Sequence, residues 1–174
     1  GGSRASPAGE LGVKSAGEVA GEIAGEVTGD RAAAPEGSIP NLNLLWAATL
    51  VRALVASGVR HIAMSPGSRS APLALAARLA EEDGLLQLHV HLDERTASFH
   101  ALGLARTLDA PVAVLCTSGT AGTHFHAAAA EATASGVPLV LLTADRPPDV
   151  RHAHAHQTID QRDLFGPSVL LWRE

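Results

Sequence analysis

The chain has 174 residues, of which 46% are hydrophobic, and this is enough to bury the core of one ordinary domain. Its net charge of −5 argues against a nucleic-acid-binding surface, and no apolar run reaches the roughly 18 residues that a membrane span needs. The single cysteine, Cys116, excludes a disulfide framework and predicts a reducing compartment, so we expect a cytoplasmic protein.

Residues 1–40 differ from the rest in composition. Glycines recur every four residues from Gly17 to Gly29, and each would cost a helix about 1 kcal/mol relative to alanine. Pro35 and Pro40 follow. We therefore predict a flexible, low-complexity extension over 1–40 and a single domain over 41–174.

From residue 41 onward, predicted helices and strands alternate. Most of the strands are continuous apolar runs, such as PVAVLC, and such runs separated by helices are typical of a parallel sheet covered on both faces. The predicted fold class is therefore three-layer α/β with a mainly parallel sheet. The predicted helices cover about 41–57, 72–82, 94–108 and a segment ending at 134, and the predicted strands cover 61–64, 87–92, 111–116, 138–144 and 168–172.

Four strand-to-helix turns should meet at one edge of this sheet, which is where open α/β sheets bind ligands. They span 65–70, 93–95, 117–122 and 145–149. Arg69 lies beside a predicted helix N-terminus, a good place for an anion. The alternative for each turn alone is a tight connection, and no GxGxxG or GxxxxGK[ST] phosphate motif is present.

Glu94 stands at the second of these turns. Gln87, His89 and His91 alternate with apolar residues as in a strand, and Asp93 is a typical helix N-cap residue. Two interpretations stay open at this point. Glu94 is either a functional acid at the sheet edge, or Asp93 and Glu94 together only cap the helix that follows.

The nine histidines raise a metal-site alternative. The run HVHLDE resembles the HxHxDH signature of metallo-β-lactamase-like hydrolases, and His152, His154 and His156 are possible further zinc ligands. However, Glu94 replaces the last histidine of that signature, and that fold is built on antiparallel sheets. We therefore expect no zinc on these histidines, and we expect His124 and His126 to face solvent.

Four segments together carry a resemblance to one family. SPGSRSAPL, HLDER followed by ALGLA, PVAVLCTSGTA and LTADRPP occur in order over about 44–174. They resemble the amino-terminal, pyrimidine-binding domain of the thiamine-diphosphate-dependent synthase of menaquinone biosynthesis, 2-succinyl-5-enolpyruvyl-6-hydroxy-3-cyclohexene-1-carboxylate synthase. The central domain and the diphosphate-binding domain of that family have no counterpart in this chain.

The resemblance implies a carbon–carbon bond-forming transferase that decarboxylates 2-oxoglutarate and adds the succinyl carbanion equivalent to isochorismate. By resemblance, Glu94 is the glutamate that hydrogen-bonds N1′ of the cofactor. The loop along the aminopyrimidine consists of Thr117, Ser118, Gly119, Thr120 and Ala121. The residues that contact isochorismate are Ser68, Arg69, Arg146 and Gln157, although His154-Ala155-His156 departs from the family pattern just before Gln157.

The resemblance also implies the cofactors and the assembly. The family binds thiamine diphosphate with Mg²⁺ or Mn²⁺, whose ligands lie in a domain that this chain does not match, so we expect no metal ligand here. A homo-oligomer with the cofactor at a subunit interface is implied, and the chain alone should be inactive. Two alternatives remain: another thiamine enzyme of this fold, against which SPGSRS and TADRPP argue, and a domain that only folds, dimerises or binds a ligand.

Overall fold

The computed structural model describes residues 41–151, 153 and 155–174. The predicted extension over 1–40 lies outside these residues. The strands are β1 (His61–Ser65), β2 (Gln87–Val90), β3 (Val112–Cys116) and β4 (Leu139–Thr143). The helices are α2 (Leu42–Ala56), α3 (Ala71–Glu82), α4 (Glu94–Leu108), α5 (His126–Ser135) and the short α6 (Pro148–Arg151). The 3₁₀ segments are η1 (Ser68–Ser70), η2 (Gly119–Phe125) and η3 (Gly166–Ser168).

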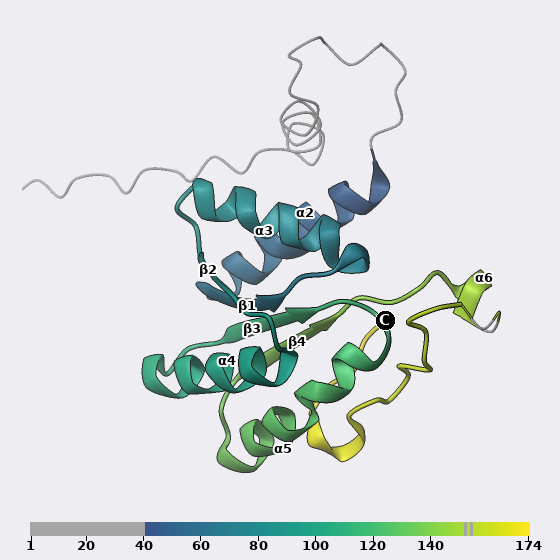
Figure 1. The fold of residues 1–174 in the computed structure, drawn as a ribbon. Coiled ribbons are helices and arrows are strands. Elements are labelled where there is room, and N and C mark those ends of the chain that lie inside the picture. Colours follow the sequence, from purple (N-terminus) through teal and green to yellow (C-terminus); the bar gives the residue numbers. More distant parts are fainter. Residues whose placement is uncertain (1–40, 152, 154) are drawn as a thin grey trace, which may run out of the picture.

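The strands form one parallel sheet in the order β2-β1-β3-β4. Helices α2 and α3 cover one face and α4 and α5 cover the other (Figure 1). The predicted three-layer α/β fold is therefore confirmed. The chain runs from β1 outward to β2 and then returns to form β3 on the other side of β1, so the strand order switches between β1 and β3. Open α/β sheets bind ligands outside such a switch point.

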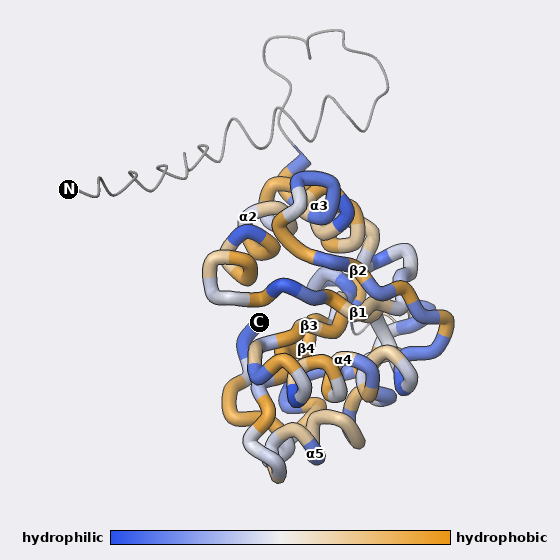
Figure 2. Tube along the Cα trace, turned by 90° about the vertical axis from the view of Figure 1, so that its left-hand side faces the viewer, coloured by the Kyte–Doolittle hydropathy of each residue, from blue (hydrophilic) through white to orange (hydrophobic). Residues whose placement is uncertain are grey.

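Two hydrophobic clusters hold the layers together, and side chains enter them alternately along each strand. In β1, Ile62 and Met64 belong to the cluster with α2 and α3, whereas Ala63 belongs to the cluster with α4 and α5. All five residues of β3 are buried, as its apolar run predicts. The hydropathy colouring shows this central apolar zone along β3 and β4 (Figure 2).

The predicted strand over 168–172 is wrong. Residues 166–168 form η3, the rest of the segment has no regular structure, and Leu170 is 94% exposed. Apolar residues predict a strand only where a neighbouring strand can pair with them, and among the described residues β4 pairs with β3 alone. The predicted strand 87–92 is also shorter, since β2 ends at Val90, although the His91 N–H still donates to the Met64 carbonyl at 2.9 Å.

The described helices contain at most 15 residues, and none of them has the length and apolar character required to cross a membrane.

Candidate functional site

The carboxyl ends of the four strands bring the predicted turns to one edge of the sheet, as expected from the parallel order. The turns after β1 and β3 touch at the switch point. A Cβ added at Gly67 would lie only 2.6 Å from the Thr117 Cβ, so a side chain at position 67 would push these two turns apart. Glycine is therefore needed at position 67 for close approach, although its extended backbone (φ −152°) is open to any residue.

The turn after β2 separates the roles of Asp93 and Glu94. Asp93 is the N-cap of α4: its Oδ1 accepts hydrogen bonds from the Thr96 N–H at 2.7 Å and from the Thr96 Oγ1 at 2.8 Å. These bonds lower the pKa of the Asp93 carboxyl. Glu94 is the first residue of α4 and is half-buried, and within the described residues its carboxylate has no hydrogen-bond or ion-pair partner. The capping role therefore belongs to Asp93, which leaves the Glu94 carboxylate free.

The Glu94 carboxylate acts electrostatically on the end of the neighbouring strand β3. The thiol of Cys116 is completely buried, and its pKa is raised to about 12, first by burial and second by the negative charge of Glu94. The negative charge of Glu94 is therefore close enough to affect groups at the centre of the sheet edge, where the turns that follow β1 and β3 meet. The same burial makes Cys116 a poor nucleophile.

Alkylation of Cys116 tests this arrangement. With a pKa of about 12, the thiolate fraction at pH 8 is about a thousand-fold lower than with the ordinary value near 9. We expect iodoacetamide to modify the folded chain at least a thousand-fold more slowly than the chain in 8 M urea. Rapid modification of the folded chain would contradict the buried position of Cys116 at the end of β3.

The loop after β3 holds the segment around Gln157 by its backbone. Ser118 is 1% exposed, and its hydroxyl donates to the Gln157 carbonyl at 3.1 Å. Gly119 has a φ of +80°, and a Cβ there would lie 2.9 Å from the Gln157 carbonyl. Both features fix residue 157, which has a positive φ of +53°, against the loop. In the same loop Thr117 is half-buried, Thr120 is exposed and Ala121 is buried.

Arg146 reaches the same segment from the turn after β4. Its Nη2 donates to the His156 carbonyl at 2.7 Å, and its buried Nε has no partner among the described residues. Consecutive carbonyls, of residues 156 and 157, are thus held by Arg146 and Ser118. Both residues are predicted site residues, but that they hold the same segment could not be predicted from the sequence. The positive φ of Gly119, which only the structure shows, is the local sign of the close approach.

Ser68 and Arg69 lie on the other side of the switch point, in η1, and both are exposed. In the described part of the chain the Arg69 guanidinium makes no hydrogen bond or ion pair. Ser65, at the end of β1, is 3% exposed, and its Oγ is buried without a partner. The structure therefore places an unpaired cation and an unsatisfied hydroxyl at the same sheet edge as Glu94.

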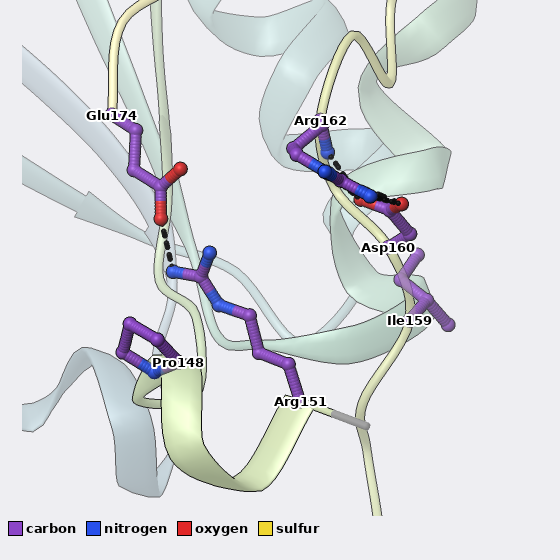
Figure 3. A pocket seen from close by; sticks show the side chains of 6 residues that line it. All are labelled: Pro148, Arg151, Ile159, Asp160, Arg162 and Glu174. Carbon is purple, nitrogen blue, oxygen red and sulfur yellow. Dashed lines mark hydrogen bonds and ion pairs between the residues drawn. The ribbon is translucent and has the colours of Figure 1, made fainter.

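A cavity of about 350 Å³ lies apart from these residues, beside α6 (Figure 3). It is lined by Pro148, Arg151, Ile159, Asp160, Arg162 and Glu174. Both arginines are already paired, Arg151 with Glu174 and Arg162 with Asp160 at 2.6 Å. The cavity contains none of the predicted site residues, and its cations are neutralised, so its lining does not provide an anion site.

The described residues contain no group of three or more histidine, cysteine or acidic side chains that could hold a metal ion. His152 and His154, two of the suggested ligands, lie outside the described residues. His124 and His126 are exposed, as predicted. The four strands within residues 41–174 that the structure describes all pair in parallel, not in the antiparallel sheets of a metallo-β-lactamase-like hydrolase, so that alternative is wrong.

Elemental analysis tests the expected lack of zinc. We expect the chain, purified without a histidine tag and passed once over a chelating resin, to carry less than about 0.1 zinc per chain. Because imidazole and carboxylate ligands bind zinc tightly only when they converge on one point, and no described group does so, the histidines should release it to the resin. A stoichiometric metal that survives the resin would contradict this prediction.

The fold and the sheet edge define a parallel α/β domain with an unpaired acid at the carboxyl edge of its described sheet. Residues 46–164 match the family described as the thiamine pyrophosphate enzyme, N-terminal TPP binding domain, and the chain belongs to this family.

Three relatives carry the name 2-succinyl-5-enolpyruvyl-6-hydroxy-3-cyclohexene-1-carboxylate synthase. The protein from Saccharopolyspora erythraea is 54% identical over 74% of this chain and 23% of its own length. Those from Haloarcula marismortui and Halorhodospira halophila are each 52% identical, over 78% and 74% of this chain and 22% and 23% of their own lengths. The chain thus spans less than a quarter of the length of these relatives.

Proposed function

We propose that this chain is the pyrimidine-binding domain of a thiamine-diphosphate-dependent synthase that decarboxylates 2-oxoglutarate and transfers the succinyl group to isochorismate. Its membership of the thiamine pyrophosphate enzyme family supports the cofactor. The names of relatives that are more than half identical to it support the reaction. The whole reaction requires regions that these relatives have and this chain does not match.

One observation carries the catalytic part of the proposal: the half-buried Glu94 carboxylate is free at the sheet edge because Asp93 caps α4. When bound, thiamine diphosphate supplies an acidic carbon, C2 of its thiazolium ring, which its aminopyrimidine activates. Glu94 would donate and recover a proton at N1′ of that aminopyrimidine. The Ser65 Oγ, buried without a partner at the same sheet edge, supports a polar site there. Thr117 to Ala121 would lie along the ring.

Two arginines support the choice of a dicarboxylate acceptor. Isochorismate has two carboxylates, which guanidinium groups bind in a planar, two-pronged geometry. Arg69 has no partner among the described residues and has an exposed guanidinium, and Arg146 has one unsatisfied nitrogen. Ser68 stands beside Arg69, and Gln157 is held beside the loop after β3. These four residues would form the acceptor side of the site.

The described residues do not fit the Mg²⁺ or Mn²⁺ site of such an enzyme, because no group of acidic side chains converges. The metal belongs, in this proposal, to another region of a homo-oligomer in the cytoplasm. Exposed apolar side chains flank Glu94 and favour a protein contact there: Leu92 is 103% exposed, Val90 63% and Phe99 44%. A subunit interface at this edge would cover them and enclose the cofactor.

The isolated 174-residue chain should bind thiamine diphosphate weakly and without a requirement for Mg²⁺. The diphosphate and its metal should supply much of the charge-based binding energy, and the chain has no fitting metal site among its described residues. Calorimetric titration with thiamine diphosphate, with and without Mg²⁺, measures this. Tight, metal-dependent binding would show that the cofactor's diphosphate site is in this chain.

The function itself is tested with the complete protein that contains this chain. We expect release of carbon dioxide from 2-oxoglutarate that depends on thiamine diphosphate and Mg²⁺, and consumption of isochorismate only when 2-oxoglutarate is present. Turnover of pyruvate in place of 2-oxoglutarate would instead indicate another thiamine enzyme of this fold. Cofactor binding without turnover of either acid would indicate a role in binding or assembly alone.

A further inference from the structure

Four histidines meet on the face of the sheet that α4 covers, and the proposed function uses none of them. His61 lies on β1, His89 on β2, His91 directly after β2, and His100 on α4. His61 Nδ1 lies 3.1 Å from His89 Nε2, and His91 Nε2 lies 2.6 Å from His100 Nδ1. The His89 and His100 rings, with centroids 4.8 Å apart, join the two pairs into one cluster.

Strand periodicity and register explain why these rings meet. Side chains of His61 and Ala63 share one face of β1, and the parallel ladder places His89 beside Ala63. On α4, the fully buried Ala97 and Ala101 allow the helix to approach this face closely. Beyond the apolar contact between Ala63 and α4, the half-buried imidazole rings thus extend the packing of α4 toward β2 at the edge of the sheet.

Neutral imidazoles suit this arrangement because each has one donor and one acceptor nitrogen. The nitrogen–nitrogen contacts of 3.1 Å and 2.6 Å each need one donor nitrogen and one acceptor nitrogen. If both rings of a pair carry a proton on every nitrogen, the contact has two donors, two positive charges and no acceptor. Protonation of both rings of a pair would therefore turn that contact from attractive to repulsive.

The neighbouring charges do little to offset this repulsion. The pKa of His89 is lowered, first by burial and then by the charges of His100, His61 and His91. Glu81 on α3 is the opposing acid, but its carboxylate already accepts the Leu88 N–H at 2.8 Å and pairs with Arg78 at 2.7 Å. The pKa of His91 is lowered by burial and then by His100.

We propose that the cluster of His61, His89, His91 and His100 is a pH-sensitive latch, which holds β2 and α4 together while its rings are neutral and releases them in acid. His89 and His91 bind protons less readily in the folded chain than in the unfolded chain. Stability conferred by the neutral rings is therefore fully present above the unfolded value near 6.5 and is lost as the pH falls below it.

The latch controls the turn that carries Glu94. His91 precedes Glu94 by three residues, and its N–H extends the ladder of β2 through the 2.9 Å bond to Met64. Opening of the cluster would therefore displace the start of α4 before the rest of the sheet unfolds. This consequence for catalysis rests on the proposed function, whereas the latch is a property of the chain alone.

Titration and unfolding of the chain test the latch directly. In proton NMR between pH 8 and 5, ring protons of His89 and His91 should titrate at a lower pH in the folded chain than in the chain unfolded in urea. The urea midpoint should be lower at pH 5.5 than at pH 7.5, and exchange of the His91 amide should accelerate in acid before that of the β3 amides. Titration of His89 and His91 in the folded chain at or above their value in the unfolded chain would overturn the proposal, whatever the activity of the enzyme.

His100→Gln is the matched variant because its amide keeps a donor and an acceptor but gains no proton. We expect it to reduce the difference between the urea midpoints at pH 7.5 and 5.5, whereas His126→Gln, on the exposed face of α5, should leave that difference unchanged. If His100→Gln does not fold, the wild-type titration and amide exchange still decide. An equal pH dependence in the wild type and both folded variants would overturn the proposal.

Discussion

Replacing Glu94 by glutamine in the complete enzyme should slow exchange of the cofactor's C2 proton by about a hundred- to ten-thousand-fold, the usual contribution of a positioned acid or base. Glutamine has the same length and still reaches N1′, but it has no proton to donate and recover there. Because Asp93, and not Glu94, caps α4, the fold and the thermal midpoint should change little. Exchange is measured by acid quench and proton NMR of the bound cofactor.

Arg95→Gln is a suitable control for this variant, because Arg95 is the next residue of α4 and is exposed. It removes a charge at the same helix end and should leave C2-proton exchange unchanged. Asp93→Ala adds a second control, since it removes the cap and lowers stability by about 0.5–2 kcal/mol while Glu94 remains. If Glu94→Gln exchanges the C2 proton at the wild-type rate, Glu94 has no acid–base role and only adds charge to the start of α4.

Local patterns were sufficient to predict the layers of the fold and the position of Glu94. The apolar run 111–116 can only be a buried strand in a domain of this size, and β3 is indeed buried throughout. Alternation over 87–92 followed by Asp93 placed Glu94 at a strand-to-helix turn, because both signals depend only on neighbouring residues. A parallel order then brings the turns to one edge whatever the order of the strands.

Features that depend on distant parts of the chain were not predictable. The run SVLLW has strand composition, yet it is not a strand, since no described strand pairs with it. Contact between Ser118 and Gln157 joins residues 39 apart, and no local signal indicates it. The histidine cluster depends on the register that sets His89 beside Ala63. Each of these depends on tertiary packing rather than on propensity.

The acceptor arginines should respond differently from Glu94 and from each other. Arg69→Ala removes a guanidinium with no partner among the described residues, so apparent affinity for isochorismate should fall about ten- to hundred-fold, as expected for loss of a charge-assisted contact. The stability of the fold should not change. C2-proton exchange and decarboxylation of 2-oxoglutarate should continue at the wild-type rate, because both steps precede the acceptor.

Arg146→Ala should lower the affinity for isochorismate at least as much and should also destabilise the domain. It removes the 2.7 Å bond to the His156 carbonyl, a contribution of about 0.5–1.5 kcal/mol, and thereby loosens the neighbouring Gln157. The measurements are the isochorismate concentration for half-maximal rate and the urea midpoint. Arg106→Ala is the control, because this exposed residue lies in the last turn of α4, at the opposite edge of the sheet.

A fall in 2-oxoglutarate decarboxylation equal to the fall in isochorismate use would show that these arginines bind the donor substrate instead. Unchanged affinity in Arg69→Ala with a loss only in Arg146→Ala would reduce the role of Arg146 to holding the segment at 156–157.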